Sequence, residues 1–563
     1  KIKNQNMSLS SELKDLEELT SNAKQIQDDM VDEILRVNAN TEYLRRFLHG
    51  SFDKELFKKN VPVVTYEDVK PYIERVANGE PSDVISGEPI THFFVSSGTT
   101  GGRQKIFPVN NKFFEKIIFT DALRTSIISM HIKGVKQGKE MKFLNTRTLS
   151  TTPSRLPVAP LMTRFLMSSY FKNWSSKRFT SPDQVILCVD NKQSMYCHLL
   201  CGLVQRSELV QAITFLETHW KEMCGNIRSG HVSEWITDRS CRDSVSAILG
   251  GPNLELTDLI ERECSKKSWE GIITRLWPNI KFVQSIATGQ MSQYIPILEF
   301  YFNKLPLISP SYSSSESIFG VNVNPLCKPQ DVTYTFLPNM SYFEFILVDG
   351  GNHDEIVDLV NVKSGCLYET LVTNHYGLYR YRMGDILQVT GFYNSAPQFR
   401  FVRRKNIVLS LQAEATTEKD LSKALNRVTI LLESSGLMLM GFTCYSDIST
   451  VPSHYVLYWE LEAKNFDGIV KLDNKVMVEC CCVVEESFNA LYRDLRSKDG
   501  SIGALEIRVV EQGTFDSLME YSISQGASAS QYKTPICISS HEALAILENK
   551  VVARFFNDNA PSL

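Results

Sequence analysis

The chain has 563 residues, of which 43% are hydrophobic and 22% charged, a composition typical of globular proteins. This length is too great for one ordinary hydrophobic core and predicts two or more domains. Lysine and arginine number 60 against 64 acidic side chains, for a formal net charge of −4. No basic cluster is interleaved with aromatic residues, so we expect no nucleic-acid partner. No apolar run reaches the ~18 residues of a membrane helix and no hydrophobic signal core precedes the fold, so we expect no membrane association and a cytoplasmic protein.

The first 35 residues carry apolar side chains at spacings of three and four, which predicts an amphipathic helix with Ser10 as its N-cap. Its apolar residues are Leu13, Leu16, Leu19, Ala23, Ile26, Met30 and Ile34. Between Pro62 and Asp385, apolar runs typical of strands alternate with helical patterns, for example at residues 90–95, 185–189 and 280–283. This alternation predicts a layered α/β domain.

A loop rich in glycine and hydroxyl residues follows the strand predicted at residues 90–95. It reads SSGTTGGRQK, from Ser96 to Lys105. Glycines let the backbone approach a polyphosphate closely, hydroxyls and free N–H groups donate hydrogen bonds, and Lys105 supplies positive charge. The spacing is not that of a Walker loop. Taken alone, such a run is more often a solvent-exposed turn.

Two later segments carry side chains suited to a nucleotide. They are YSSSE, from Tyr312 to Glu316, and YRMGD, from Tyr381 to Asp385. Asp385 is able to accept hydrogen bonds from both ribose hydroxyls, Tyr312 to pack on a base, and Glu316 to hold a magnesium ion. Each segment is a weak signal alone, because most Asp and Glu residues are solvated surface groups. Together the three segments predict one site at which ATP activates a carboxylic acid.

The composition shifts near residues 403–406, and we place a domain boundary near residue 404. Residues 1–404 are then a large N-terminal domain and residues 405–563 a small C-terminal one. Strand-like runs at residues 454–462 and 505–510 are interspersed with amphipathic helices in the latter. Ser539 with Glu542 three residues later predicts the start of a last helix, whose apolar stripe contains Leu544, Leu547, Val551 and Phe555.

Thirteen cysteines are scattered from Cys188 to Cys537. The run from Cys480 to Cys482 has neither zinc-ligand spacing nor neighbouring histidines. We therefore expect reduced thiols rather than disulfides or a metal site.

In this order and at these separations, the three nucleotide segments resemble the adenylate-forming superfamily that includes firefly luciferase and the acyl-CoA synthetases. Longer strings resemble its plant branch, the auxin-responsive acyl acid amido synthetases, and most closely the benzoate-conjugating members. These strings are NHYGLYRYRMGDILQVTGFYN, FRFVRRKN, IGALEIRVVEQGTFD and QGASASQYKTP. The resemblance runs from about Leu13 to Phe556. It implies that a large N-terminal α/β domain, which binds ATP and the acyl acid, meets a small mobile α+β C-terminal domain across the active site.

The resemblance also implies a reaction. The acid attacks the α-phosphate of ATP, pyrophosphate departs, and the amine of an amino acid displaces AMP to give an amide. Positioning and charge stabilisation carry such a reaction, so no nucleophilic triad is needed. We expect ATP and Mg²⁺ as cofactors, a small-molecule acyl acid and an amino acid as partners, and a monomer.

Individual roles follow residue by residue from the resemblance. It assigns Tyr312 and Ser315 to the nucleotide, Glu316 to Mg²⁺ and Asp385 to the ribose, with Arg404 as a further nucleotide contact. The loop residues that it assigns to the phosphates, together with the loop lysine, are Ser96, Ser97, Thr99, Thr100 and Lys105.

Two basic residues complete the predicted site. Lys533 lies where a lysine of similar enzymes moves into the site and neutralises the phosphates during adenylation; the alternative is a solvated surface lysine. Arg124 matches an arginine that pairs with the acyl carboxylate in benzoate-conjugating relatives, a pairing that a guanidinium fork suits. Its alternative is a buried structural ion pair or a snorkelling side chain.

The chain departs from the family pattern at several positions. Ser313 stands where glycine or alanine usually follows the tyrosine, and Ile536 stands where relatives often carry an arginine. The chain is also short by about a dozen residues near Leu209 to Ala212, and again short near Phe466 to Val470. Whether these gaps are real deletions or loops missing from the sequence, the residues that line this part of the substrate pocket are not specified.

The acid is expected to be aromatic, namely an indole-type auxin, an auxin precursor or a benzoate, rather than jasmonate. One rival interpretation is an acyl-CoA ligase, which shares the adenylation but passes the acyl group to a thiol. Another is a non-catalytic hormone-binding protein that keeps the fold with a decayed site. The intact loop, Glu316, Asp385 and Lys533 argue against the second rival.

Overall fold

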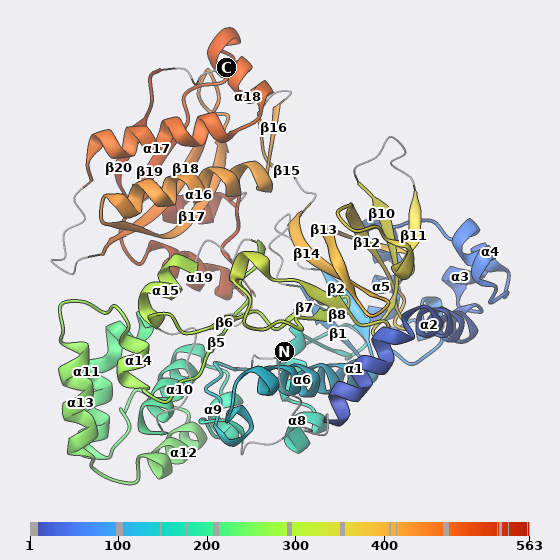
Figure 1. Ribbon diagram of the computed structural model, residues 1–563, viewed down its shortest axis with the longest axis horizontal. Coiled ribbons are helices and arrows are strands. Elements are labelled where there is room, and N and C mark those ends of the chain that lie inside the picture. Colours follow the sequence, from blue (N-terminus) through green and yellow to red (C-terminus); the bar gives the residue numbers. More distant parts are fainter. Residues whose placement is uncertain are drawn as a thin grey trace, which may run out of the picture.

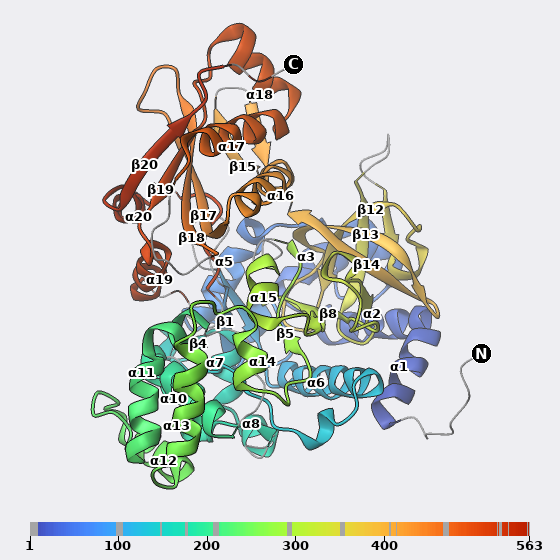
Figure 2. The ribbon, with the colours of Figure 1, turned by 60° about the vertical axis from the view of Figure 1, so that its left-hand side comes forward.

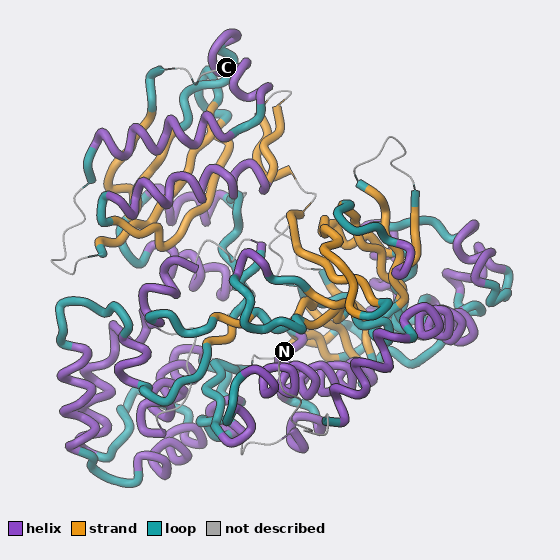
Figure 3. Tube along the Cα trace, in the orientation of Figure 1, coloured by secondary structure: helices purple, strands orange, loops and turns teal. Residues whose placement is uncertain are grey.

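The computed structural model places the elements up to residue 404 in a larger body, and those from residue 407 onward in a smaller body beside it (Figures 1 and 2). Helices, strands and loops are distinguished in Figure 3. The structure describes residues 10–96, 105–146, 149–174, 178–205, 213–289, 295–348, 355–404, 407–411, 414–464, 472–525, 527, 532–538, 540–559 and 561.

Helices open the chain. They are α1 (Ser11–Ser21), α2 (Ala23–Asn38), α3 (Glu42–Leu48), α4 (Lys54–Asn60) and α5 (Tyr66–Ala77). The prediction of one helix over this start is wrong in detail, because the backbone leaves the helical conformation at Asn22 (φ −106°, ψ 24°). The break lets Leu13 of α1 pack with Phe113 while Ile34 of α2 packs in a different core. Ser10 is the N-cap residue, but its side chain makes no capping hydrogen bond.

Late strands hold these first helices in place. The buried amide of Gln27 on α2 donates to the carbonyl oxygens of Pro338 and Ser341, at 2.7 Å each, and accepts from the backbone N–H of Phe343 at 2.8 Å. The hydroxyl of Ser395 donates to the carbonyl of Thr20 at 2.6 Å. The N-terminal helices are therefore integral to a body whose strands come more than 300 residues later.

A small mixed sheet carries the glycine-rich loop. Its order is β2-β1-β4-β3, and β1 pairs antiparallel with β2 and parallel with β4. The bounds are β1 (His92–Val95), β2 (Ile106–Val109), β3 (Ser150–Thr151) and β4 (Pro157–Ala159), followed in the chain by α7 (Leu161–Leu166) and α8 (Ser169–Trp174). The strand predicted at residues 90–95 is confirmed. The long helix α6 (Lys112–His131) follows β2 and packs against α1 (Figure 1).

A helical region with its own core lies at the lower left of Figure 1. It contains α9 (Asp183–Ile186), α10 (Asn191–Gln205), α11 (Ile213–Ser229), α12 (Arg239–Leu249), α13 (Leu254–Cys264), α14 (Ile272–Leu276) and α15 (Ile295–Phe302). The strand predicted at residues 185–189 is wrong, since α9 begins directly after Pro182, a residue that favours a helix start. Of residues 280–283, only the last belongs to a strand, β5 (Val283–Gln284), which pairs parallel with β6 (Leu307–Ile308).

An antiparallel eight-stranded sheet carries the other two nucleotide segments. Its order is β11-β10-β12-β13-β14-β9-β8-β7. The bounds are β7 (Ser311–Ser313), β8 (Ile318–Val321), β9 (Tyr334–Phe336), β10 (Tyr342–Leu347), β11 (Ile356–Asp358), β12 (Leu367–Thr373), β13 (Tyr381–Tyr393) and β14 (Ala396–Arg404). Phenylalanines from β8, β9, β10 and β14 pack together in its core. YSSSE thus begins on one edge strand, β7, and YRMGD begins β13.

The smaller body is a sheet of order β17-β18-β19-β20 covered on both faces. Helices α16 and α17 lie on one face, and α19 and α20 on the other (Figure 2). The bounds are β15 (Ile407–Leu411), β16 (Glu414–Thr417), α16 (Glu418–Ser434), β17 (Leu437–Asp447), β18 (His454–Ala463), α17 (Asn474–Ser487), α18 (Ala490–Asp494), β19 (Glu506–Val510), α19 (Thr514–Ser524), α20 (His541–Glu548) and β20 (Val551–Phe556). The strands predicted at residues 454–462 and 505–510 are confirmed.

The predicted last helix is only partly correct. Helix α20 ends at Glu548, and its N-cap is Ser540, whose hydroxyl accepts from the backbone N–H of Ala543 at 3.2 Å. Ser539 lies outside the described residues. Val551 and Phe555 belong to β20, which pairs antiparallel with β19. Val551 and Phe555 continue the helical spacing of Leu544 and Leu547, but the helix ends before them.

Four further expectations concern the whole chain. All thirteen cysteines lie in described residues and are free thiols, as predicted. Within the described residues, every helix is too short or too polar to cross a membrane. The domain boundary near residue 404 falls between β14 and β15 and stays a prediction. Both apparent gaps, near residues 209–212 and 466–470, lie outside the described residues.

Candidate active site

The glycine-rich loop begins and ends on a closed pair of strands. The backbone N–H of Ser96 donates to the carbonyl of Lys105 at 2.8 Å, and the N–H of Lys105 donates to the Ser96 hydroxyl at 3.1 Å. The ammonium of Lys105 lies 5.2 Å from the ring centroid of Tyr66, a cation–π contact. The other predicted phosphate residues, Ser97, Thr99 and Thr100, lie outside the described residues. Both ends of the predicted phosphate loop are therefore fixed by the β1–β2 hairpin.

Tyr312 and Asp385 lie in contact, although 73 residues separate them in the chain. The Tyr312 hydroxyl donates to the Asp385 carboxylate at 2.5 Å, and the Tyr312 ring stacks on Phe319 with centroids 4.5 Å apart. Asp385 is only 3% exposed. A carboxylate accepts several hydrogen bonds, so Asp385 has acceptor capacity beyond its bond with the Tyr312 hydroxyl. The structure thus brings together two segments that the sequence predicted to form one site.

Asn374 connects YSSSE to the turn that precedes β13, and its role was missed in the sequence. Its side-chain N–H donates to the carbonyl oxygen of Glu316 at 3.1 Å, and its side-chain oxygen accepts from the backbone N–H groups of Tyr376 and Leu378. The turn that follows has Gly377 at φ +105°, where a side chain would also collide with Ile85. An asparagine directly before such a glycine turn was the available signal.

The position of Glu316 is fixed by the turn between β7 and β8, and that of Arg404 by its strand, β14. The backbone N–H of Glu316 donates to the Ser314 hydroxyl at 3.2 Å, so both backbone groups of Glu316 are held while its side chain is half-buried. Ser315, beside it, is half-buried as well. In the register of β13 and β14, Arg404 stands directly opposite Asp385. Only its backbone belongs to the described part of the chain.

Arg124 belongs to a largely buried network of five charged side chains. Its guanidinium contacts Asp121, which is 3% exposed and also accepts from Arg178 at 2.5 Å. Glu140 accepts from Arg178 at 2.7 Å, and Lys142 lies 3.0 Å from Glu140. Burial acts to raise the pKa of Asp121, but the three cations hold it below its usual range. The five side chains together carry a net charge of +1. Arg124 is ion-paired, which agrees with the alternative prediction of a structural ion pair.

Lys533 lies on a segment that runs beside β17 in the smaller body. The backbone N–H of Cys444 donates to the carbonyl of Ile536 at 2.7 Å, and the N–H of Ile538 donates to the carbonyl of Cys444 at 2.8 Å. The hydroxyl of Thr443 donates to the carbonyl of Pro535 at 2.6 Å. These bonds fix the chain just after Lys533, which is itself half-buried rather than fully solvated.

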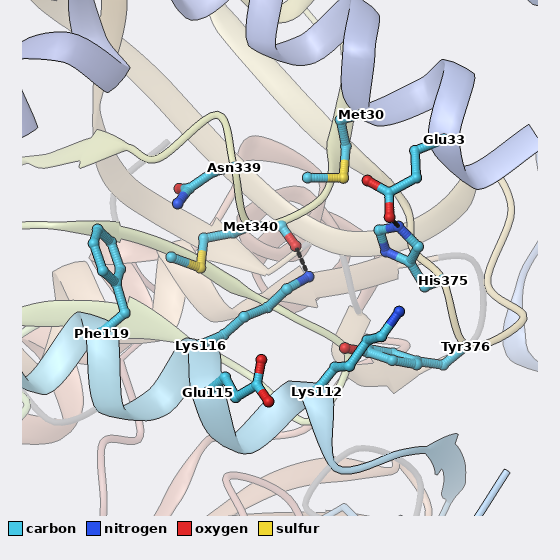
Figure 4. A pocket seen from close by; sticks show the side chains of 10 residues that line it. All are labelled: Met30, Glu33, Lys112, Glu115, Lys116, Phe119, Asn339, Met340, His375 and Tyr376. Carbon is cyan, nitrogen blue, oxygen red and sulfur yellow. Dashed lines mark hydrogen bonds and ion pairs between the residues drawn. The ribbon is translucent and has the colours of Figure 1, made fainter. Parts of the chain in front are cut away.

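A recess of about 330 Å³ lies next to Asn374, between α2, α6 and the turn before β10 (Figure 4). The side chains that line it are Met30, Glu33, Lys112, Glu115, Lys116, Phe119, Asn339, Met340, His375 and Tyr376. Lys116 donates to the carbonyl of Met340 at 2.5 Å, and burial lowers its pKa to about 8. His375 is 7% exposed and lies 3.5 Å from Glu33. The lining of this recess includes none of the site residues predicted from the sequence.

Family descriptions match three parts of the chain. The GH3 family N-terminal domain matches residues 12–307, the central domain residues 334–404 and the C-terminal domain residues 419–542. The chain is 55% identical to 4-substituted benzoates-glutamate ligase GH3.12 of Arabidopsis thaliana, over 97% of this chain and 98% of the relative. The chain belongs to the GH3 family.

Further relatives agree with this membership. Indole-3-acetic acid-amido synthetase GH3.17 of Arabidopsis thaliana is 49% identical to this GH3 chain, over 98% of the chain and 96% of the relative. The solved structure of AtGH3.15 acyl acid amido synthetase in complex with 2,4-DB superposes with a TM-score of 0.92 at 48% identity, covering 100% of this chain and 99% of that one. The predicted family, α/β fold class and enzyme class, an amide-forming ligase, are confirmed.

Proposed function

We propose that the chain activates a carboxylic acid as its acyl-adenylate and then joins the acyl group to the amine of an amino acid. The contact between Tyr312 and Asp385 is the observation that carries this proposal. It joins β7 to β13, and the bond from Asn374 to the Glu316 carbonyl joins the turn after β7 to the turn before β13. A tyrosine, a buried carboxylate and a second carboxylate beside a fixed phosphate-type loop suit ATP better than a thiol or sugar substrate.

Within this proposal, each residue acts by binding or orienting. The loop ends at Ser96 and Lys105 hold the β- and γ-phosphates together with Ser97, Thr99 and Thr100. Asp385 holds the ribose, Tyr312 and Ser315 the nucleotide, and Arg404 contacts it from the neighbouring strand. Lys533 neutralises charge at the α-phosphate while pyrophosphate leaves, after residues 405–563 move as a domain against residues 1–404.

Mg²⁺ fits this residue set. The described residues contain no group of three or more metal-binding side chains, and Mg²⁺ at nucleotide sites usually takes one or two carboxylates together with the phosphates. Glu316, with its backbone held at both ends, supplies one such carboxylate. When bound, the ion would neutralise phosphate charge.

The acid is proposed to be aromatic, either a benzoate or an indole-type auxin or its precursor. The relatives named above act on 4-substituted benzoates and on indole-3-acetic acid. The network around Arg124 supports an anionic substrate, because its net charge of +1 is balanced by one carboxylate. We further propose that the chain works as a cytoplasmic monomer of 63.9 kDa, which light scattering of the purified protein tests.

Arg124→Ala is expected to raise the KM for the acid by about tenfold to hundredfold, while the KM values for ATP and the amino acid stay unchanged. The reason is the loss of one charge-assisted pair of ~1.5–3 kcal/mol that only the acid makes. Steady-state kinetics with each substrate varied in turn measures this. Arg178→Ala is the matched control, since Arg178 makes more contacts within the protein and its loss should lower the melting temperature most. Equal losses for all three substrates after Arg124→Ala would leave Arg124 purely structural.

Asp385→Ala is expected to weaken ATP binding, because each ribose hydroxyl that loses its acceptor costs ~1–3 kcal/mol. Isothermal titration with ATP measures the change. Tyr312→Phe is the control, because it removes the hydroxyl that bonds to Asp385 but leaves the carboxylate for the ribose. Unchanged nucleotide affinity in folded Asp385→Ala protein would remove Asp385 from the site.

A substrate panel tests the whole proposal. Purified protein is mixed with ATP, Mg²⁺ and pairs of plant carboxylic acids and amino acids, and products are identified by mass spectrometry. Amides of aromatic acids are expected. A coenzyme A thioester without any amide would instead make the chain an acyl-CoA ligase. Acid binding without AMP release would favour the non-catalytic hormone-binding protein.

A further inference from the structure

The segment that carries Lys533 is held against β17 at one paired position. Cys444 on β17 and Cys537 stand opposite each other in a parallel bridge. The two backbone hydrogen bonds on either side of this bridge connect Cys444 to Ile536 and to Ile538. Neighbouring strands lie ~4.7–4.9 Å apart, inside the ~4.4–6.8 Å between Cα atoms that a disulfide spans. The backbone therefore presents two cysteines at a separation that a disulfide can bridge.

The two thiols belong to one bridge position and donate to neighbouring carbonyl oxygens. The Cys444 thiol donates to the carbonyl of Ile536 at 2.8 Å, and the Cys537 thiol donates to the carbonyl of Ile538 at 3.8 Å. Cys444 is fully buried, whereas Cys537 is partly exposed at the edge of the core. One cysteine of the pair is thus within reach of a small solute, and the other stands opposite it in the bridge.

We propose that Cys444 and Cys537 are a peroxide-sensitive thiol pair, and that their disulfide fastens the Lys533 segment to β17 and stops adenylation. The effect on adenylation rests on the function proposed above for Lys533. The peroxide-sensitive thiol pair does not, since it needs only the pairing of the two cysteines.

The chemistry is a two-electron oxidation by hydrogen peroxide. The Cys537 thiolate attacks one peroxide oxygen, the O–O bond breaks, and a sulfenic acid and hydroxide form. The Cys444 sulfur then attacks the sulfenic sulfur, the S–O bond breaks, and water leaves as the S–S bond forms. Burial raises the pKa of the Cys444 thiol, while the neighbouring Cys444 side chain lowers the pKa of the Cys537 thiol. Cys537 is accordingly the attacking residue and Cys444 the resolving one.

The disulfide changes the position of Lys533 through a short stretch of chain. An S–S bond of ~2.05 Å is shorter than the contact between two unbonded sulfur atoms, so Cys537 is drawn toward β17. Lys533 precedes Cys537 by four positions, with Pro535 already bonded to Thr443 between them. The domain movement brings Lys533 to the site, but the last adjustment of its position relative to β17 is local, and a covalent link at Cys537 opposes that adjustment.

The test oxidises the full-length protein with graded hydrogen peroxide, blocks the remaining thiols with N-ethylmaleimide and maps peptides without reduction. The expected product is a cross-linked peptide pair that contains Cys444 and Cys537. Acid-dependent exchange of pyrophosphate into ATP should fall at least about tenfold in the same samples and return after dithiothreitol. Amide formation from a supplied acyl-adenylate should keep its rate.

Variants separate the possible outcomes. Cys537→Ser and Cys444→Ala should both resist peroxide, whereas Cys366→Ser, which removes a partly buried thiol of the larger body, should stay sensitive. Absence of the cross-linked pair overturns the proposal. A cross-linked pair with full pyrophosphate exchange, in a protein that Lys533→Ala inactivates, overturns the coupling to adenylation. If Lys533→Ala leaves adenylation intact, the function proposed for Lys533 fails, and a cross-linked pair still supports the thiol site.

Discussion

Lys533→Ala is expected to slow acyl-adenylate formation by ~100- to 1,000-fold, because one preorganised donor is lost where charge develops on the leaving pyrophosphate. Conversion of a supplied acyl-adenylate and an amino acid to the amide should proceed at nearly the wild-type rate. The proposed function gives the lysine no part in that second step, for which the smaller domain is proposed to take another position. Rapid-quench measurement of each half-reaction separately checks both statements.

A second lysine of the smaller body controls for loss of surface charge. Lys550 forms an exposed ion pair with Glu511 at 2.8 Å, and exposed pairs contribute little to stability. Lys550→Ala should therefore leave both half-reactions unchanged. Equal losses in the two half-reactions of Lys533→Ala would contradict the assignment and make Lys533 structural or shared between steps.

Arg380→Met is expected to destabilise the larger body by about 3–5 kcal/mol, the usual cost of removing one partner of a buried ion pair. Arg380 is 6% exposed, and its guanidinium holds the Glu344 carboxylate with two bonds of 3.0 Å. It also donates to the carbonyls of Lys58 and Val61, which lose their donor. Denaturant unfolding followed by tryptophan fluorescence measures the loss.

The double variant Arg380→Met with Glu344→Met is the control for this effect. Burial raises the pKa of Glu344, which shows how costly its lone charge is in this place. Apolar replacement of both partners removes that charge and should recover much of the lost stability. A single variant as stable as the wild type would mean that water reaches Glu344 and that the pair contributes little.

The sequence predicted some strands correctly and misassigned other segments, for local reasons. Residues 454–462 and 505–510 are strands because their β-branched and aromatic runs are buried on both faces. Residues 185–189 form the same kind of run, yet Pro182 and Asp183 start a helix there. Short apolar runs do not distinguish the two states. The spacing of Leu547, Val551 and Phe555 likewise fits a helix until the chain turns at Asn549.

The sequence proposed the residues of the candidate site one by one, but it did not predict the contacts among them. Asp121 lies three residues before Arg124 on one helix, so that pair could have been read from the sequence. Arg178 and Lys142 come from distant segments, and only the fold brings them to Asp121. The bond between Tyr312 and Asp385 joins an edge strand to a central strand of the sheet. No local pattern encodes such a pairing.

The bonds of Gln27 have a consequence for synthesis of the protein on the ribosome. The Gln27 side chain cannot form its bond to Pro338 until that residue has been made, 311 residues later. At about 5–20 residues per second, that delay lasts on the order of 15–60 s. During this time, the apolar face of α2, with Val31, Ile34 and Leu35, lacks the late strands that complete its surroundings. The nascent chain therefore needs protection from aggregation at its first helices until the segment from Pro338 to Phe343 has been made.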